Sequence, residues 1–239
     1  WLKPLGFWKR QLPPVKELRG TMMFMTIFMV MAAVVLYFLQ PLFFPGEPDK
    51  DFQVVQPDDS PVLMGHLELY KEALGDDFVP YRNHCLRVMS FTKYFLGGKE
   101  MELGTKQVLE AALAYHDLGL WSDKKASYLG PSAARARKEL SDNFDEDEMK
   151  QIEDLIMNHH KYTESPDPVV DAMRKADWLD FTRNLRIPML SGMPSGNVAK
   201  AVQEVPLEGF FTALGKRPFA IRPENPLRAV LELMEIFKW

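Results

Sequence analysis

Residues 21–39, TMMFMTIFMVMAAVVLYFL, contain no charged side chain, and this run restricts the fold more than any other feature of the chain. As a helix it would be about 28 Å long at about 1.5 Å per residue, close to the ~30 Å hydrocarbon thickness of a lipid bilayer. A buried core helix is the weaker alternative, because a helix that is apolar on every face needs a large soluble protein around it. We therefore predict that residues 21–44 form a single transmembrane helix in contact with the bilayer.

The flanks of this run indicate an uncleaved anchor with a defined orientation. A signal peptide fits less well, because about twenty residues precede the run and no small-residue cleavage site follows it. Residues 1–20 form a basic flank with five Lys or Arg side chains against one acid, whereas residues 45–60 carry five acids and one lysine. By the positive-inside rule, we expect the N-terminus in the cytoplasm and the main domain on the extracytoplasmic side.

The remainder of the chain is predicted to be a linker, a helical domain and a C-terminal extension. Residues 45–60 are rich in proline and acids and should form an irregular linker. Residues 61–190 should form an all-α domain, because apolar residues recur at helical spacing and no strand pattern appears. The predicted helices are 62–75, 80–96, 105–118, 131–141, 145–160 and 167–185. Residues 191–239 begin with a loop and an aromatic patch and end in a short helix, expected to pack on the domain or, alternatively, to contact a membrane surface or partner.

Composition excludes several classes of function. A net charge of -4, with scattered basic residues after position 60, argues against a protein that binds a nucleic-acid polymer. The single cysteine, Cys85, excludes an internal disulfide framework and a cysteine-rich zinc site. Apolar residues make up 46% of the chain, which is ample for a buried core.

Several ionisable side chains fall on apolar helical faces. In the second predicted helix, His84 shares a face with Val88, so its imidazole should point inward. In the next helix His116 ends an apolar stripe, and Asp117 follows it close enough to reach the same point. Near a helix end, such neighbouring side chains can act on one ligand.

Two later helices repeat this pattern. His159 continues the face of Ile156, His160 stacks one turn after Ile156, and Asp177 continues the apolar stripe that contains Met173. Each inward histidine, taken alone, is more often a hydrogen-bonded core residue than a ligand. Burying several charges together without a partner costs several kcal/mol per charge, and a metal ion is the usual remedy. Together these residues therefore favour a metal site.

The order of these residues resembles the HD-domain superfamily, whose signature is a histidine, a His-Asp doublet and a distal aspartate on a bundle of helices. The segments AALAYHDLGL, IEDLIMNHH and KADWLDF are similar to the family's ligand helices, and the resemblance covers roughly residues 80–185. It implies an HD-type helical bundle after the transmembrane helix. It also implies a first divalent metal held by His84, His116, Asp117 and Asp177, with His116 and Asp117 as the catalytic pair.

The resemblance also bears on a second metal. His159 and His160 match positions that help to bind a second ion in dinuclear members of the family. Those members commonly have a further histidine between the doublet and the His-His pair, where this chain offers only Ser132. The sequence therefore leaves open whether the site holds one ion or two. Asp180, one turn after Asp177, is expected either to orient a ligand from the second shell or to be a surface acid.

The residues after the doublet depart from the phosphohydrolase pattern. Many phosphohydrolase members read Gly-Lys there, whereas this chain has Gly119-Leu120, which is more similar to the branch of cyanamide hydratase-like proteins. Positive charge for a phosphate would have to come from Lys124, Lys125 or Arg137, which are otherwise ordinary exposed residues.

Imidazole and carboxylate ligands suit Mn, Fe, Mg or Zn, and ligand type does not choose between them. A divalent ion makes water more acidic and polarises an acceptor oxygen of a substrate. The leading hypothesis is a membrane-anchored, metal-dependent phosphohydrolase that acts on a small phosphorylated substrate such as a nucleotide. The alternatives are a non-catalytic HD-fold subunit of a complex with membrane-protein partners, and a diiron oxygenase or hydratase on the same fold. Substrate-binding residues are not identified by the sequence.

Overall fold

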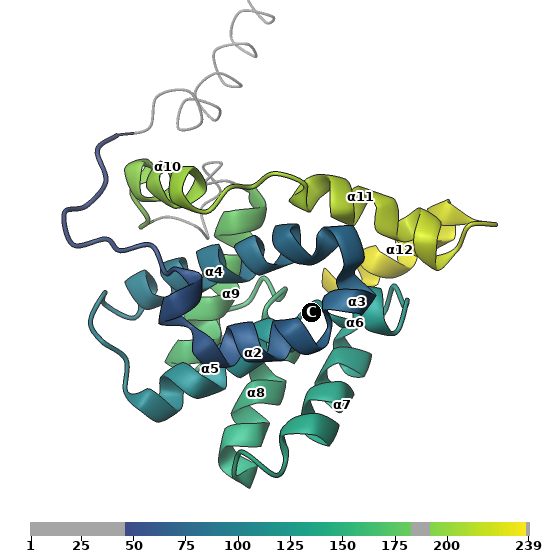
Figure 1. Cartoon of the computed structure of the whole chain (residues 1–239), viewed down its shortest axis with the longest axis horizontal. Coiled ribbons are helices and arrows are strands. Elements are labelled where there is room, and N and C mark those ends of the chain that lie inside the picture. The colour runs from purple at the N-terminus through teal and green to yellow at the C-terminus, as the bar shows by residue number, and fades with distance from the viewer. Residues whose placement is uncertain (1–45, 183–191, 238–239) are drawn as a thin grey trace, which may run out of the picture. The chain divides into compact units, whose positions relative to one another are not determined.

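The computed structural model describes residues 46–182 and 192–237 (Figure 1). The predicted transmembrane helix 21–44 and the basic flank 1–20 lie outside these residues. Within the two described ranges, no helix is both long enough and apolar enough to cross a bilayer.

All regular elements of the described ranges are helices, which confirms the all-α prediction. The α-helices are α2 Pro61–Leu69, α3 Lys71–Leu74, α4 Phe78–Phe95, α5 Leu103–Tyr115, α6 Gly119–Ser122, α7 Leu129–Leu140, α8 Glu146–Asn158, α9 Pro168–Thr182, α10 Ser195–Glu204, α11 Phe210–Ile221 and α12 Pro226–Met234. Three 3-10 helices accompany them, η1 Pro57–Asp59, η2 Gly75–Asp77 and η4 Glu235–Phe237.

Local sequence signals explain where the helices of the site begin. The Asp145 carboxylate accepts the Glu148 backbone N–H at 2.9 Å, and the Glu148 side chain accepts the Asp145 N–H at 2.9 Å, a capping box that starts α8. Asp167 accepts the N–H groups of Val169 and Val170 at 2.7 and 3.1 Å, and α9 begins at Pro168. These caps set the register of the helices that carry the later candidate ligands.

Two stretches differ from the sequence prediction. The expected helix 62–75 is divided at Tyr70 into α2 and α3, and it ends at Gly75, whose φ of 54° lies in the left-handed region. The expected loop and aromatic patch after residue 191 contain two further helices, α10 and α11. The prediction missed α11 because Gly215 and Pro218 both disfavour a helix, although Pro218 lies only in its last turn.

Residues 46–56, in the predicted linker, contain no helix and lead into η1, and this segment packs against the helices. Phe52, Val54 and Val55 are buried, and the Val55 N–H donates to Ser90 Oγ on α4 at 2.9 Å. The Asp49 N–H donates to the Asn197 side chain on α10 at 2.7 Å. The buried core therefore extends upstream of residue 61 to Phe52.

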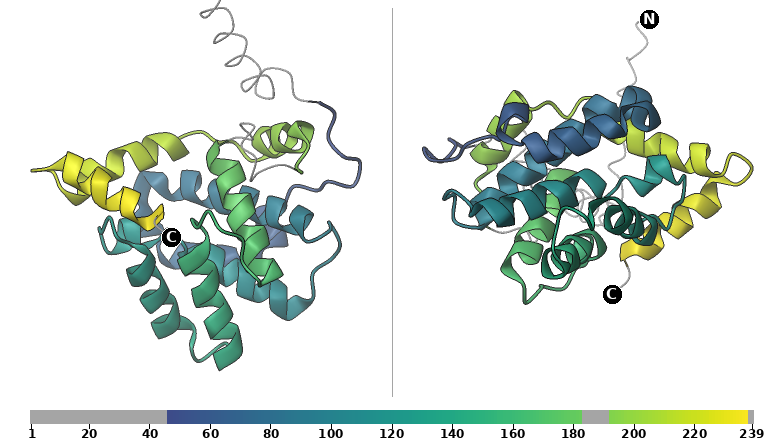
Figure 2. Two further views of the ribbon diagram at one scale, coloured as in Figure 1. Left: turned by 180° about the vertical axis from the view of Figure 1, so that it is seen from behind. Right: turned by 60° about the horizontal axis from the view of Figure 1, so that its bottom comes forward.

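Helix α4 lies at the centre of the packed elements. It runs along α9 and also contacts α5, while α5 packs between α2 and α8 (Figures 1 and 2). Helices α7 and α8 pack against each other, as do α11 and α12, and α11 also contacts α4. The arrangement brings the middle of α4 and α9 close to the C-terminal ends of α5 and α8.

Candidate metal centre

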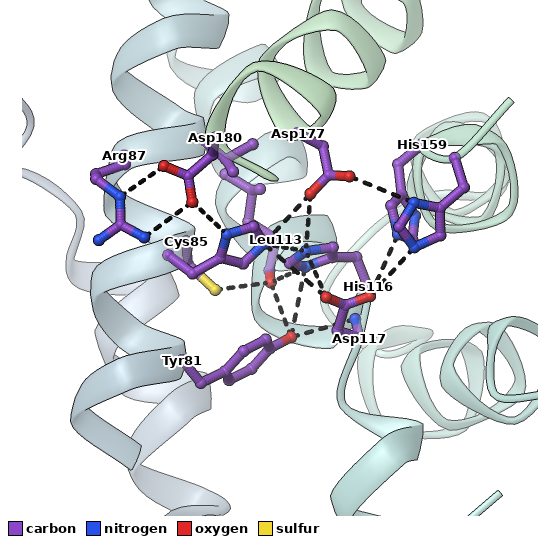
Figure 3. A network of polar contacts seen from close by, with 12 residues as sticks. Tyr81, Cys85, Arg87, Leu113, His116, Asp117, His159, Asp177 and Asp180 are labelled. Carbon is purple, nitrogen blue, oxygen red and sulfur yellow. Dashed lines mark hydrogen bonds and ion pairs between the residues drawn. The ribbon is translucent and has the colours of Figure 1, made fainter. Parts of the chain in front are cut away.

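The candidate ligands come from four helices and meet inside the domain. His84 lies on α4 and Asp177 on α9, whereas His116 and His159 are the residues that follow the last turns of α5 and α8. All of these side chains are buried, as is Asp117. Figure 3 shows His116, Asp117, His159 and Asp177 turned toward one another. The packing of α4 on α9 and of α5 on α8 therefore gathers the predicted residues in one place.

Short distances join the members of this cluster. His84 Nε2 lies 3.1 Å from His116 Nε2 and 3.2 Å from Asp177 Oδ1, and His116 Nε2 lies 3.5 Å from Asp117 Oδ2. Two groups each offer three ligand atoms within 4.8 Å of one another, and each could hold a metal ion. They are His84 with His116 and Asp117, and Asp117 with His159 and His160. Because Asp117 belongs to both groups, two ions could be held side by side.

Backbone carbonyls orient two of the imidazoles. His116 Nδ1 lies 2.7 Å from the Leu113 carbonyl and His159 Nδ1 lies 2.7 Å from the Ile156 carbonyl, so each Nδ1 donates to the last turn of its own helix. With Nδ1 protonated, Nε2 of a neutral ring is the acceptor, and both Nε2 atoms face the cluster. This is the tautomer that a metal ligand requires.

One buried contact in the cluster needs either a proton or a cation to be stable. His159 Nε2 and Asp117 Oδ1 lie 3.3 Å apart, and neither atom has a hydrogen-bond partner among the described residues. Both are buried acceptors when the histidine is neutral, and two such acceptors do not stabilise each other. A cation between them, or a proton on His159, removes the conflict.

The charges of the cluster match a divalent cation. Within the described ranges, each ion pair of Asp117 and Asp177 within 4.0 Å is with a histidine. The two carboxylates therefore need two positive charges, supplied either by two imidazolium groups or by one divalent ion. The donor set of imidazole and carboxylate is one that such ions bind.

The pKa values of the cluster are lowered at four positions, which favours the metal-binding forms of His116, Asp117, His160 and Asp177. The pKa values are raised at two positions, which favours the protonated forms of His84 and His159. Burial lowers the pKa of His116 to about 4, although Asp117 opposes this shift, so its ring is neutral at neutral pH. Burial opposes ionisation of Asp177, but its hydrogen bond with His84 and the nearby histidines lower its pKa to about 2. At His84, burial is outweighed by hydrogen bonds with Asp177 and Asp180, which raise its pKa to about 9.

The structure gives Asp180 a buried position next to His84. Asp180 Oδ2 lies 2.8 Å from His84 Nδ1, and the Arg87 guanidinium donates to both carboxylate oxygens at 2.6 and 2.8 Å. The guanidinium also donates to the Val205 and Pro206 carbonyls at 3.1 and 2.9 Å. Asp180 thus orients the imidazole of His84, and Arg87 balances its charge.

Sequence reasoning missed Arg87, Tyr81 and Tyr128. Arg87 is fully buried, and its position on the same helical side as His84, three residues on, was the available signal. The Tyr81 hydroxyl accepts the Asp117 N–H at 3.2 Å, and the Tyr128 hydroxyl lies 2.6 Å from His160 Nε2. No residue pattern marks Tyr128, because it reaches the site from the turn before α7.

Other residues considered in the sequence lie elsewhere. Ser132 is buried and its hydroxyl accepts the Gly119 N–H at 2.9 Å, so it holds the turn after the doublet. Lys124 and Lys125 are exposed, and Arg137 forms ion pairs with Glu153 and Glu146 on α8. His66 is not among the residues of the cluster, and its ring packs against Tyr115.

A cavity of about 190 Å³ opens beside the cluster. Four candidate ligands line it, His84, Asp117, His160 and Asp177. Its other described lining residues are Leu120, Tyr128, Trp178, Phe181, Phe210, Leu214, Arg217, Leu233 and Ile236. The candidate metal ligands are therefore accessible to a small molecule.

Comparison with known proteins adds no further assignment. No family model matches the chain, and neither the curated proteins nor the solved structures searched contain a match.

Proposed function

We propose that this protein is a metal-dependent hydrolase of the HD-domain type. The observation that carries the proposal is the contact between Asp117 Oδ1 and His159 Nε2, two buried atoms 3.3 Å apart that have no other hydrogen-bond partner in the described ranges and are both acceptors when His159 is neutral. Two further imidazoles and Asp177 converge on the same point. Convergence of these residues is the arrangement that the HD-domain resemblance implies.

The candidate ligands would form two ion positions. His84, His116, Asp117 and Asp177 would hold the first ion. Asp117, His159 and His160 would hold a second, with Asp117 shared between them. A bound divalent cation of the Mn, Fe, Mg or Zn class supplies acidity to water and polarises an acceptor oxygen of the substrate.

The protein's own groups would complete the reaction. Hydrolysis adds the hydroxyl of water to the acceptor atom of the substrate and a proton to the leaving group. Tyr128, hydrogen-bonded to His160, is the hydroxyl at the cavity that could pass that proton. Asp180 and Arg87 would keep the His84 ring in place throughout.

The membrane anchor 21–44 and the extracytoplasmic orientation are further parts of this proposal, and a phosphorylated substrate is the expectation that the HD-domain resemblance gives. They rest on the sequence alone. The cationic groups considered for phosphate binding, Lys124, Lys125 and Arg137, do not line the cavity, so the residues that would bind phosphate are not among them.

A second candidate function is a non-catalytic HD-fold subunit of a membrane complex. The observation that favours it is the exposed apolar surface of the C-terminal helices, where Phe219, Leu227, Leu231 and Met234 are each more than half exposed. Such a surface is typical of contact with a partner or a lipid surface. A subunit of this kind needs no metal, whereas the hydrolase requires one.

Metal content and turnover test the proposal together. The protein purified without added metal is expected to contain a divalent ion and, with that ion, to release p-nitrophenolate from p-nitrophenyl acetate or p-nitrophenyl phosphate. Asp117→Asn, which keeps the size of the side chain, should lose both properties because Asp117 belongs to both ion positions. His66→Gln changes a half-buried histidine outside the cluster, so this variant should keep both its metal and its turnover.

The outcomes separate the two candidates. Folded protein without metal and without turnover, isolated with membrane-protein partners, would favour the subunit. Turnover retained in Asp117→Asn with unchanged metal content would contradict the hydrolase proposal. Circular dichroism of each variant checks that the helical fold is intact.

A further inference from the structure

The cavity beside the metal cluster has two unlike walls. One part of its lining consists of candidate metal ligands, whereas the rest, the apolar wall, consists mainly of apolar side chains. Much of that wall comes from the C-terminal extension, through Phe210, Leu214, Leu233 and Ile236. The extension therefore contributes to the site and does not merely pack on the outside of the domain.

Phe210 joins the extension to the metal ligands. Its ring stacks on the His84 imidazole with the ring centroids 4.3 Å apart and the planes at 12°. Phe210 is buried and begins α11, directly after Gly209, whose φ of 85° lies in the left-handed region. A side chain at position 209 would meet Pro80 at 2.7 Å, so glycine allows α11 to approach α4 this closely.

The size of the cavity limits what it can admit. Its volume of about 190 Å³ falls below the range of about 300–1,000 Å³ that is usual for drug-sized ligands. An apolar cavity of about 150 Å³ is known to accommodate benzene. A single substituted ring fits this volume, whereas a nucleoside with its phosphates would extend beyond it.

The charge of the cavity lining also favours a small, neutral ligand. Among the described lining residues, Arg217 is the one with a permanent positive charge. Its Nη2 atom donates to Asp77 Oδ2 at 2.8 Å, and its guanidinium lies over the Trp121 ring at 5.3 Å, so the charge is already balanced. Its Nε atom is buried and has no acceptor among the described residues. Arg217 is therefore suited to donate one hydrogen bond to a neutral group.

We propose that the C-terminal extension, residues 205–237, makes this site selective for small, neutral and largely apolar molecules of about one ring that carry one hydrogen-bond acceptor. The proposal rests on the proposed metal-dependent hydrolase for its chemistry. It replaces a nucleotide with a compact substrate, since the described part of the wall offers mainly apolar contact and the unpaired Arg217 Nε–H group. Leu214 is then a residue that determines specificity, because it lines the cavity without belonging to the metal cluster.

Binding measurements on the full chain test this selectivity without turnover. Ligand-observed NMR compares benzamide with benzoate and adenosine monophosphate, on Zn²⁺-loaded protein and after treatment with a chelator. Benzamide should bind at least about tenfold more tightly than adenosine monophosphate in the loaded protein. Leu214→Trp fills the cavity and should weaken benzamide binding about tenfold or more while leaving the zinc content unchanged.

A matched variant controls for the added indole. Phe219 lies on the same helix but is 64% exposed and does not line the cavity, so Phe219→Trp should bind benzamide as the parent does. Arg217→Lys keeps the charge beside Asp77 and removes the Nε–H group, so it should reduce the preference for benzamide over benzene.

The results distinguish failure of this inference from failure of the hydrolase proposal. Tighter binding of adenosine monophosphate than of benzamide would overturn the inference. Equal loss of benzamide binding in Leu214→Trp and Phe219→Trp would also overturn it. Absence of bound zinc, with benzamide binding intact, would contradict the hydrolase proposal alone.

Discussion

Arg87 and Asp180 form a two-point ion pair inside the domain, with Nε–Oδ1 and Nη2–Oδ2 distances of 2.6 and 2.8 Å. Asp180 Oδ2 is also 2.8 Å from His84 Nδ1. The pair therefore links the framework of α4 and α9 to the orientation of a candidate metal ligand. Such outer contacts are as much part of a metal site as the ligands themselves.

Asp180→Asn should affect both stability and metal binding. The variant leaves the buried Arg87 without its counter-charge, so we expect a loss of about 3–5 kcal/mol in the free energy of unfolding. The weaker hold on the His84 ring should reduce metal affinity about 10- to 100-fold. Urea unfolding and calorimetric titration with zinc measure these two quantities.

The control for this change is Asp123→Asn. Asp123 pairs with Arg135 at 3.0 Å, but both side chains are partly exposed, so its loss should cost at most about 1 kcal/mol. Equal destabilisation of the two variants would contradict the structural role given to Asp180.

Removal of metal should lower the stability of the protein. An ion that binds only the folded chain stabilises it by about 2.7 kcal/mol when its free concentration is 100 times the dissociation constant. Thermal unfolding with zinc and with a chelator should therefore differ by several degrees for the parent chain. Asp117→Asn should show no such difference, and a chelator effect of the same size in that variant would place the ion elsewhere.

Gly119→Ala should disturb the turn after the doublet. A Cβ atom at this position would lie 2.8 Å from the Tyr128 carbonyl and 3.0 Å from Ser132 Oγ, so the start of α7 must shift. We expect a loss of about 1–3 kcal/mol in the free energy of unfolding. Weaker metal binding should accompany it, because Tyr128 also contacts His160.

Gly130→Ala is the matched control, since a Cβ atom there meets nothing within 4 Å. Position 130 lies in α7, where alanine is favoured over glycine, so this variant should be neutral or slightly more stable. Denaturant unfolding of both variants separates close contact from a general effect of adding a methyl group.

His66 should make stability depend on pH. Burial lowers its pKa, against a smaller opposing effect of Glu139, so the unfolded chain binds a proton more readily than the folded chain. Its contribution is fully present above the ordinary pKa of about 6.5 and is lost as the pH falls below that value. His66→Gln should flatten the unfolding free energy between about pH 7 and 5, and an unchanged pH profile would contradict the assignment.

The sequence predicted the helical class because apolar periodicity follows directly from burial on one helical face. The same reasoning predicted that His84, His116 and Asp177 point inward, and the structure brings these side chains together. Convergence of separate helices cannot be read from periodicity, so it needed either the resemblance or the coordinates.

Hydrophobic periodicity did not predict one helix and several residues of the cavity. Helix α11 contains residues that disfavour helices, and tertiary contacts such as the stacking of Phe210 on His84 outweigh that preference. Arg217 approaches the site from a segment far away in the sequence, and Tyr128 from the residue before α7, so no helical periodicity connects them with it. The apolar wall of the cavity was missed for the same reason.

The Leu113 and Ile156 carbonyls accept hydrogen bonds from the Nδ1–H groups of His116 and His159, and each carbonyl lies only three residues before its histidine. The ring angle of these two imidazoles is therefore specified by the final turn of α5 and α8. Both imidazole rings are therefore oriented before an ion binds, and these side chains lose little rotational freedom on binding it. Uptake of the ion should then require desolvation and proton release more than any rearrangement of the helices.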